Sequence, residues 1–211
     1  MKLYLNKTPE IIRPFAKDMI WSLPSETPSL FLTFDDGPIP EITPRVCTIL
    51  AQFNAKATFF CVGDNVKKHP VEYQQLLEEG HSVGNHTYNH LNGWSSKNLS
   101  YYRNVYLAKK YINSRLFRPP YGKMKRRQSM RLKDKFDIIM WDVLSGDFDS
   151  NVSASQCADN VIKNARNGSI IVFHDSLKAS KTMLKALPEV LSHFARLNYQ
   201  FKAIPMNGLA S

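Results

Sequence analysis

The sequence predicts an α/β fold, a distorted (β/α) barrel of about seven parallel strands with outer helices. Short apolar runs alternate with longer amphipathic segments along nearly the whole chain, an order typical of parallel strands joined by helices. Polar and charged residues also gather where the apolar runs end, which is where such folds bind ligands. An open doubly wound sheet is the alternative that the same alternation allows.

The predicted strands are, in chain order, residues 30–34, 57–62, 82–85, 117–118, 137–143, 169–174 and 200–204. The predicted helices are residues 42–53, 71–79, 99–113, 125–135, 155–164 and 182–197. Val71, Leu76 and Leu77 illustrate the roughly helical spacing of apolar residues in these segments.

The length of 211 residues suits one domain over residues 1–211, with a motif-bearing core at about 29–205. A chain of this size buries enough apolar surface to need no disulfides. The three cysteines, Cys47, Cys61 and Cys157, form no C-x-x-C pair, and we expect them to be buried thiols.

No run of 18 apolar residues is present, so no transmembrane helix is predicted. The first residues, MKLYLNKTPE, lack the apolar core of a signal peptide. The sequence as written therefore favours a cytoplasmic protein, although a mature form without its signal would look the same.

The net charge is +10, and the densest basic run is KMKRRQSMRLKDK, from Lys123 to Lys135. Such a run is compatible with a solvated helix face, with binding of an acidic polymer or anionic envelope component, or with binding of nucleic acid. No nucleic-acid-binding module surrounds it, so nucleic acid is not expected.

An apolar strand, LFLTF, ends in the adjacent aspartates Asp35 and Asp36. Side by side in a pocket, two carboxylates repel one another unless a cation offsets their charge. One aspartate is then available as a metal ligand and the other as a general base toward water. A solvated Asp-Asp-Gly-Pro turn without a ligand is the alternative.

Two histidines, His86 and His90, lie four residues apart in HTYNH. On a helix or tight turn, imidazoles at that spacing can share one metal. Asp36 would complete a set of two histidines and one carboxylate with positions open for water or substrate. The histidine pair alone is a weak signal, since many such pairs are surface residues.

Five ordered motifs resemble those of the polysaccharide deacetylase family, carbohydrate esterase family 4. They are TFDDGP at Thr33–Pro38, HTYNH at His86–His90, RPPYG at Arg118–Gly122, WDVLSGDF at Trp141–Phe148 and IIVFHD at Ile170–Asp175. The resemblance spans roughly residues 30–204 and implies a distorted barrel and hydrolysis of an N-acetyl group on an amino sugar.

The resemblance also implies a role for each matching residue. Asp36, His86 and His90 would bind the metal, Asp35 would be the catalytic base, and Arg118 would hold Asp35 in place. The metal implied is one divalent ion, zinc, with cobalt, nickel or manganese as alternatives.

The remaining motif residues would act on the substrate. Tyr121 would offer its backbone N–H to the oxyanion, and His174 would be the general acid, oriented by Asp147. Phe148 and Val172 would line the pocket for the acetyl methyl, where the family usually has Trp and Leu. These two departures leave the acyl group and the size of the substrate open.

Several other polar and aromatic residues have two readings. Asp142 and Asp175 are either supports of the site or plain strand-end caps, and Trp141 is a core residue more than a sugar platform. Trp94, in the NGWSS loop, is the better candidate for stacking on a sugar ring.

The sequence thus predicts a metal-dependent N-deacetylase acting on peptidoglycan- or chitin-type N-acetylglucosamine. The alternatives are the same site acting on a small non-sugar amide or imide, and a catalytically silent carbohydrate-binding module. The family often works outside the cytoplasm, so the resemblance also allows a cell-envelope or secreted location.

Overall fold

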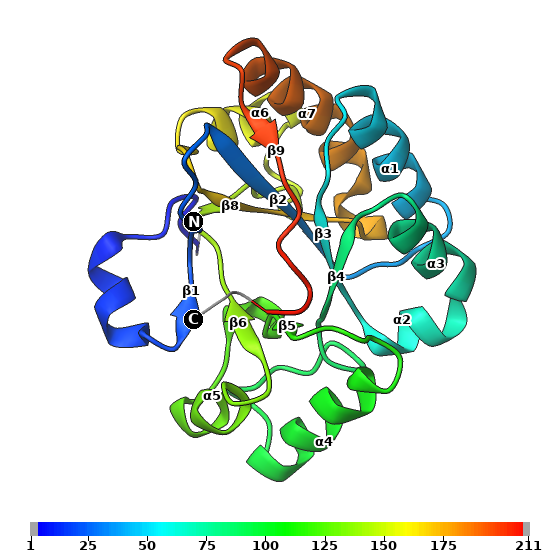
Figure 1. Ribbon diagram of the computed structural model, residues 1–211, viewed down its shortest axis with the longest axis vertical. Helices are drawn as coiled ribbons and strands as arrows, with labels where there is room; N and C mark the ends of the chain where they lie inside the picture. Colours follow the sequence, from blue (N-terminus) through cyan, green and yellow to red (C-terminus); the bar gives the residue numbers. More distant parts are fainter. Residues whose placement is uncertain (1–3, 209–211) are drawn as a thin grey trace.

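The structure, a computed structural model, describes residues 4–208, in which strands and helices alternate (Figure 1). In chain order, with η for 3-10 helices, the elements are η1 (Glu10–Ala16), β1 (Met19–Ile20), β2 (Ser29–Asp35), α1 (Thr43–Gln52), β3 (Thr58–Cys61), α2 (Gly63–Lys68), α3 (Pro70–Glu78), β4 (Ser82–Asn85), α4 (Asn98–Lys109), β5 (Leu116–Phe117), η2 (Pro120–Gly122), α5 (Arg126–Leu132), β6 (Asp137–Ile139), β7 (Val143–Leu144), α6 (Ala154–Ile162), β8 (Ile170–His174), α7 (Leu177–Arg196) and β9 (Gln200–Phe201).

The strands of residues 4–208 form one sheet with the order β1–β6–β5–β4–β3–β2–β8–β7, and β9 pairs with the start of β2. Every pairing between these strands is parallel. Figure 1 shows the sheet curved around a central space with the α-helices outside it. The predicted distorted (β/α) barrel is therefore confirmed.

One extended segment, residues 137–144, links the two ends of the curved sheet. Its first part, β6, pairs with β5, whereas its second part, β7, pairs with β8. The N-terminal segment covers the junction, because β1 pairs with β6 and Lys7 forms a bridge with Val143. The prediction of one continuous strand over residues 137–143 was wrong for this reason: the segment changes partner halfway.

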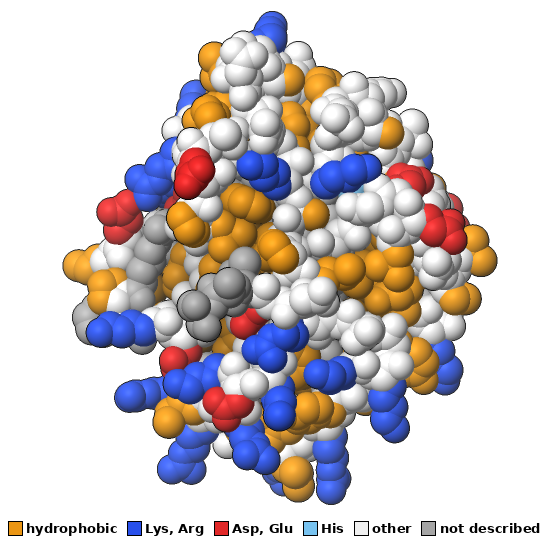
Figure 2. All heavy atoms as spheres, in the orientation of Figure 1, with side chains coloured by type: hydrophobic (Ala, Val, Ile, Leu, Met, Phe, Trp, Pro, Cys, Tyr) orange, Lys and Arg blue, Asp and Glu red, His pale blue; other side chains and the backbone are white. Residues whose placement is uncertain are grey.

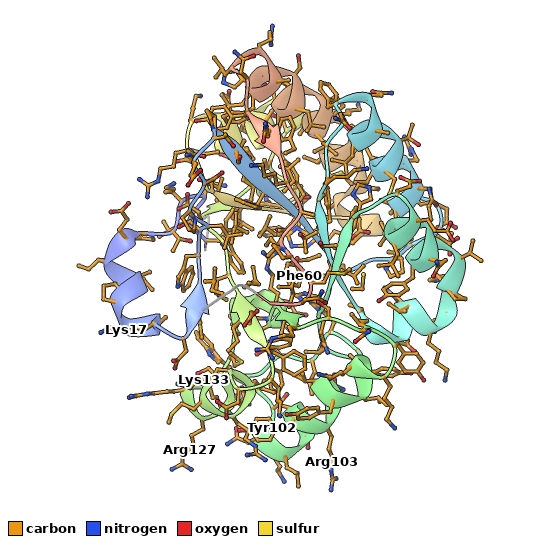
Figure 3. All side chains as sticks on the ribbon, viewed as in Figure 1. Lys17, Phe60, Tyr102, Arg103, Arg127 and Lys133 are labelled. Carbon is orange, nitrogen blue, oxygen red and sulfur yellow. The ribbon has the colours of Figure 1, made fainter. Side chains whose placement is uncertain are left out.

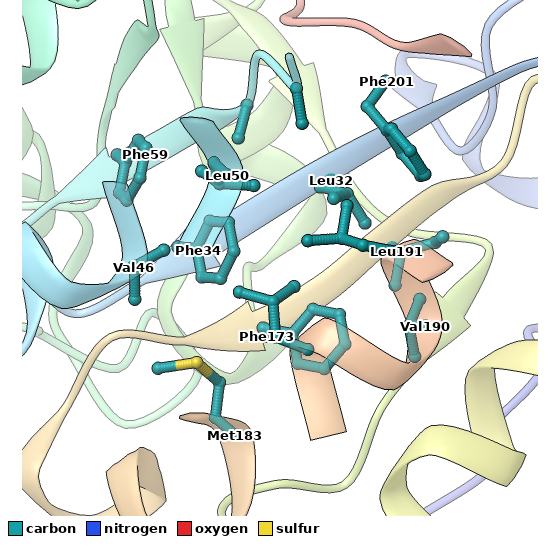
Figure 4. Close-up of a cluster of buried hydrophobic side chains, with 14 of the residues drawn as sticks. Leu32, Phe34, Val46, Leu50, Phe59, Phe173, Met183, Val190, Leu191 and Phe201 are labelled. Carbon is teal, nitrogen blue, oxygen red and sulfur yellow. The ribbon is translucent and has the colours of Figure 1, made fainter. Parts of the chain in front are cut away.

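Strand β2 separates two apolar regions through the alternation of its side chains. Leu30, Leu32 and Phe34 belong to the outer core, which helices α1 and α7 cover. Figure 4 shows this packing, with Val46 and Leu50 from α1 and with Met183, Val190 and Leu191 from α7. Phe31, Thr33 and Asp35 alternate with these residues and thus face the barrel interior.

The interior is filled by a second apolar cluster at the end of the barrel where the strands begin. Its members are Leu23, Phe31, Phe60, Leu116, Ile139, Ile170 and Ile204. Figure 3 shows Phe60 near the middle of the sheet, and Figure 1 shows the C-terminal segment crossing in front of it. The backbone N–H of Ile204 donates to Oγ1 of Thr58 at 2.8 Å, which fixes this segment. The strands therefore leave only their carboxyl ends open.

The helices differ from the predicted ones mainly in two places. Helix α7 begins at Leu177, five residues before the predicted start, and α2 was not predicted at all. The sequence of α2, GDNVKK, has little apolar periodicity. Its first amides instead donate to loop carbonyls, Gly63 to Thr87 and Asp64 to Tyr88. Tertiary contacts therefore stabilise α2 where local sequence does not.

Two further expectations concern segments without a site role. The three cysteines are free and buried, as predicted. In the described part of the chain, no helix has the length and apolar character that a membrane crossing requires.

Truncating Ile204 tests the contribution of the C-terminal segment. Ile204→Ala removes a fully buried side chain and should lower the free energy of unfolding by about 2–4 kcal/mol in urea titrations. Leu99→Ala, which truncates a side chain that is 61% exposed, should change it by less than about 0.5 kcal/mol. Equal effects of the two substitutions would show that the segment does not seal the barrel.

Candidate metal centre and active site

The two adjacent aspartates point in different directions. Asp35 is the last residue of β2, and its Oδ1 accepts a hydrogen bond of 2.7 Å from Nη1 of Arg118. Asp36 has a φ of 88°, a left-handed conformation that is costly for a residue with a Cβ. Its carboxylate turns toward His86 and His90. The left-handed residue thus gives the two carboxylates different partners.

The carboxylate of Asp175 holds the turn that follows. Its Oδ1 accepts from the backbone N–H of Gly37 at 3.0 Å, and its Oδ2 accepts from Oγ1 of Thr43 at 2.6 Å. A Cβ at position 37 would lie 2.0 Å from Oδ2 of Asp175, so only glycine fits. Burial raises the pKa of Asp175 to about 8; the Thr43 bond opposes this and the charge on Asp36 adds to it. Asp175 is therefore a support of the site.

Arg118 is fully buried inside the barrel, and all three of its guanidinium nitrogens donate hydrogen bonds. It donates to Oδ1 of Asp35 and Oγ1 of Thr33, both at 2.7 Å, and to the carbonyls of Ile139 at 3.1 Å and Met140 at 2.9 Å. Its guanidinium also lies 4.1 Å from the ring centre of Phe60. The predicted partnership of Arg118 with Asp35 is thus present in the structure.

His86 and His90 lie on a turn after β4. The sequence allowed a helix or a tight turn for this pair, and the structure has the turn. Oδ1 of Asn85 accepts from the backbone N–H of Thr87 at 2.8 Å, and Asn85 also donates to α4. Oδ1 of Asn104, on α4, accepts from the backbone N–H of Tyr88 at 2.8 Å. Thr87 and His90 have φ values of 65° and 58°, so a helix is excluded there. Helix α4 therefore holds the turn in place.

The three predicted metal ligands converge. Oδ1 of Asp36 lies 3.2 Å from Nε2 of His90 and 3.8 Å from Nε2 of His86. That oxygen is buried and accepts no hydrogen bond of good geometry from residues 4–208. Burial alone would raise the pKa of Asp36, but the imidazoles of His90, His174 and His86 lower it below its usual range. An orphaned carboxylate oxygen facing two imidazoles fits a divalent cation.

The backbone selects the tautomer of His86 that binds metals. Its Nδ1 lies 2.8 Å from the carbonyl of Arg118, so Nδ1 carries the proton and Nε2 keeps its lone pair. Burial lowers the pKa of His86 to about 4, the carboxylate of Asp35 opposes that shift, and His90 adds to it. His86 therefore stays neutral, as a metal ligand must.

A second cluster, Cys47, Glu79 and His81, has ligand atoms within 4.8 Å of one another. Here Nδ1 of His81 accepts a hydrogen bond of 3.2 Å from the backbone N–H of Ala57. Nε2 therefore carries the proton in neutral His81, and its lone pair is not available to a metal. The hydrogen bond joins the residue before β4 to the residue before β3, and Nε2 of His81 lies 3.8 Å from Oε2 of Glu79.

His174, at the end of β8, pairs with Asp147. Its Nδ1 lies 2.7 Å from Oδ1 of Asp147, and its backbone N–H donates to Oδ2 at 2.7 Å. Burial alone would lower the pKa of His174. The charge and hydrogen bond of Asp147, helped by Asp36 and Asp35, raise it to about 9. His174 thus holds a proton at neutral pH, as a general acid must.

The predicted substrate-binding residues occupy different depths. Tyr121 is 60% exposed, has a φ of 60°, and its ring centre lies 4.6 Å from that of His90. Phe148 meets His174 edge to face at 5.2 Å, whereas Val172 is only 1% exposed, on β8. Trp94, 60% exposed, lies on the loop after His90. Phe148 thus lies beside His174, and Tyr121 lies beside His90.

Asp142 does not support the site, which was one of its two predicted roles, because it lies at the opposite end of β8 from His174. Its carboxylate accepts from Oγ of Ser169, before β8, at 2.5 Å and from Nζ of Lys7 at 2.6 Å. His174 is the last residue of the same strand, so about 13 Å of extended backbone separates the two ends of β8.

Trp141 was predicted to be a core residue more than a sugar platform. Its side chain is partly buried, and a Cβ at Gly122 would clash with it at 2.5 Å, so Trp141 packs closely against this glycine.

Several contributors were not identified in the sequence. Thr33 receives Arg118, Asn104 holds the histidine turn, and Nδ2 of Asn65 donates to the carbonyl of Asp36 at 2.7 Å. Thr33 had a signal, because a threonine inside an apolar strand needs a partner when buried. Asn65 and Asn104 lie on polar helix surfaces, where nothing local marks them.

Comparison with known proteins agrees with this geometry. The profile of the family described as Polysaccharide deacetylase matches residues 23–135. A peptidoglycan-N-acetylglucosamine deacetylase of Bacillus cereus is 31% identical, over 87% of this chain and 90% of the relative. A chitooligosaccharide deacetylase of Azorhizobium caulinodans is 34% identical, over 70% of this chain and 73% of the relative.

A solved structure is similar over almost the full length. It is a peptidoglycan N-acetylglucosamine deacetylase in complex with 4-naphthalen-1-yl-N-oxidanyl-benzamide, 30% identical, with a TM-score of 0.86. The match covers 95% of this chain and 97% of that one.

Metal analysis distinguishes the two clusters. The wild-type protein loaded with zinc and then desalted should hold about one equivalent, and His86→Ala should hold less than about 0.1 because a ligand is missing. Glu79→Gln, in the second cluster, should still hold about one equivalent. Wild-type metal content in His86→Ala, or a loss in Glu79→Gln, would contradict the assignment.

The pKa of His174 should depend on Asp147. His174 is protonated below about pH 9 and neutral above it, since the carboxylate favours the charged form. Asp147→Asn should lower that pKa by about two units, because the counter-charge is removed. Histidine NMR titration of the metal-free protein measures this, with Asp149→Asn as a nearby control that should change little. An unchanged pKa in Asp147→Asn would refute the pairing.

Proposed function

Since the chain belongs to the polysaccharide deacetylase family, we propose that it hydrolyses the N-acetyl amide of an amino sugar in a glycan. The observation that carries the proposal is the convergence of three groups at one mouth. They are a metal-ligand set with an orphaned carboxylate oxygen, a second carboxylate held apart from it, and a protonated histidine. Amide hydrolysis needs a nucleophile, a charge sink and a proton donor, which these groups supply.

Asp36, His86 and His90 would hold the metal, and we propose zinc, with cobalt, nickel and manganese as alternatives. Two imidazoles and one carboxylate suit zinc and leave positions open. When bound, such an ion lowers the pKa of water and stabilises negative charge on a carbonyl oxygen.

Asp35 would be the general base. Arg118 occupies its Oδ1, whereas its Oδ2 faces the site, 4.0 Å from Nε2 of His86. The Arg118 bond fixes the direction of the carboxylate, so Oδ2 takes the proton from the attacking water as the new C–O bond forms. The backbone N–H of Tyr121 would donate to the oxyanion that develops on the amide carbonyl.

His174 would be the general acid. It gives its proton to the sugar nitrogen as the amide C–N bond breaks, and the products are acetate and a free amine. Asp147 keeps Nδ1 engaged, so Nε2 is the atom that faces the substrate. Phe148 and Val172 would bound the space for the acetyl methyl, and Trp94 would stack on a sugar ring.

We propose peptidoglycan- or chitin-type N-acetylglucosamine chains as the substrate, and the names of the similar peptidoglycan and chitooligosaccharide deacetylases support this. No observation in residues 4–208 favours a small non-sugar amide. The complete set of base, acid and ligands is unlike a silent binding module.

Acetate release tests the function. The zinc-loaded protein should release acetate from N-acetylglucosamine oligomers or peptidoglycan, lose this activity after chelation and regain it with zinc. An N-hydroxybenzamide, the class of compound in the similar solved structure, should inhibit it, because N-hydroxyamides chelate metals.

Asp35→Asn sharpens the same test. It should lower kcat about 100- to 10,000-fold with the metal retained, since the amide keeps the shape but cannot accept the proton. Loss of metal in this variant would mean that base and ligand are misassigned. No acetate from any glycan, with glycan binding unaffected by chelation, would overturn the proposed function.

A further inference from the structure

Two exposed lysines each lie above an aromatic ring at the rim of the site. Nζ of Lys123 is 5.3 Å from the ring centre of Trp94, and Nζ of Lys178 is 5.9 Å from that of Phe148. Both distances are within the range of cation–π attraction. The rim therefore carries two similar units, each made of an apolar surface and an ammonium group.

The two aromatic–lysine pairs flank the metal centre. Trp94 follows the turn after β4, and Lys123 follows η2 after β5. Phe148 follows β7, and Lys178 lies in the first turn of α7 after β8. In the sheet, β4 and β5 lie on one side of β2, and β8 and β7 lie on the other. A glycan placed across the carboxyl end of β2 therefore passes between the pairs.

The Trp94 pair is held by its own hydrogen bonds. Nε1 of Trp94 donates to the carbonyl of Met124 at 3.2 Å. The backbone N–H of Gly93 donates to the carbonyl of Lys123 at 3.2 Å. Nε2 of Gln128, on α5, donates to the carbonyl of Gly93 at 3.0 Å. Indole and ammonium are thus positioned together, which lowers the entropy lost on binding.

Apart from the two aromatic rings, these lysines have no charged partner within residues 4–208. No carboxylate there lies within ion-pair distance of Lys123 or Lys178. Asp149, close to the Phe148 pair, accepts from Tyr4 at 3.0 Å and from the backbone of Asn151 at 3.0 Å. The two ammonium groups therefore face solvent at the rim.

Further basic side chains follow Lys123 in the chain, on α5. Figure 2 shows Lys and Arg side chains gathered over α4 and α5, and Figure 3 shows Arg103 and Arg127 projecting from this edge. Arg126 and Arg131 are also exposed, and Lys133 is partnered by Asp18 at 2.9 Å. No ring contact of Arg126, Arg127 or Arg131 is present within residues 4–208, in contrast to Lys123.

We propose that Lys123 and Lys178 make the site selective for N-acetylated glycans whose sugars flanking the reacting residue carry carboxylates. The proposal rests on the proposed function and deepens it. A sugar ring stacks on Trp94, and its carboxylate-bearing substituent reaches Nζ of Lys123. On the other side of the reacting sugar, a carboxylate reaches Nζ of Lys178, beside Phe148. A neutral glycan uses the aromatic surfaces alone, so it binds less tightly.

The probe is a tetrasaccharide that alternates N-acetylglucosamine with its 3-O-lactyl ether, as the free acid and as the methyl ester. The two differ in charge and hardly in size. We expect kcat/KM for acetate release to be about fivefold higher for the acid, mainly through KM, since exposed ion pairs contribute little each. The acid-to-ester ratio should fall toward one in about 0.5 M salt, because the attraction between exposed charges is then largely screened.

Charge variants identify the groups responsible. The double variant Lys123→Gln/Lys178→Gln should bring the acid-to-ester ratio below about two. Lys202→Gln, which removes one charge at the opposite end of the barrel, should keep the wild-type ratio. Arg126→Gln/Arg127→Gln/Arg131→Gln should keep most of it.

Three outcomes would overturn this inference. They are equal rates for acid and ester in the wild type, an unchanged ratio in the double lysine variant, and a ratio lost only in the α5 variant. Release of acetate from the ester shows that the proposed function holds even if selectivity fails. No release from either substrate counts against the function itself.

Discussion

A guanidinium buried in the middle of the barrel, that of Arg118, determines the arrangement of the site around it. It joins β5 to β2 through Asp35 and Thr33, and it donates to the carbonyls of Ile139, the last residue of β6, and Met140. The carbonyl of the same residue sets the tautomer of His86. Burying a charge costs desolvation free energy that hydrogen bonds and a counter-charge offset, so the loss of one partner is costly. Base orientation and ligand chemistry thus depend on one residue.

Four residues at or beside the metal centre lie on turns with unfavourable backbone conformations. Asp36, Thr87, His90 and Tyr121 all have φ between 58° and 88°. Such conformations persist only when the surroundings hold them. Here the holding groups come from neighbouring helices and strand ends, with Asp175 on the aspartate turn as one example. These backbone conformations lower the stability of the fold, and they direct side chains toward the metal centre.

Much of this was predictable, because apolar runs that stop at polar residues mark the strand ends. Asp35, Arg118 and His174 all lie where the sequence placed them. The change from pairing with β5 to pairing with β8 within residues 137–144 was not predictable. It depends on contacts such as that of Asp142 with Ser169, which is distant in the chain. The helix α2 was missed because its stabilising contacts are also tertiary. Local patterns carry no information about such partners.

The C-terminal segment, with Ile204 packed under Phe60 and Leu116, has a consequence for how a polymer is handled. A barrel closed at one end offers no tunnel, so a long glycan cannot be threaded from its terminus. The glycan chain must lie across the open end of the barrel, with sugars extending past the rim in both directions. For the proposed glycan substrate, access is then independent of chain ends, and an interior unit is as reachable as a terminal one.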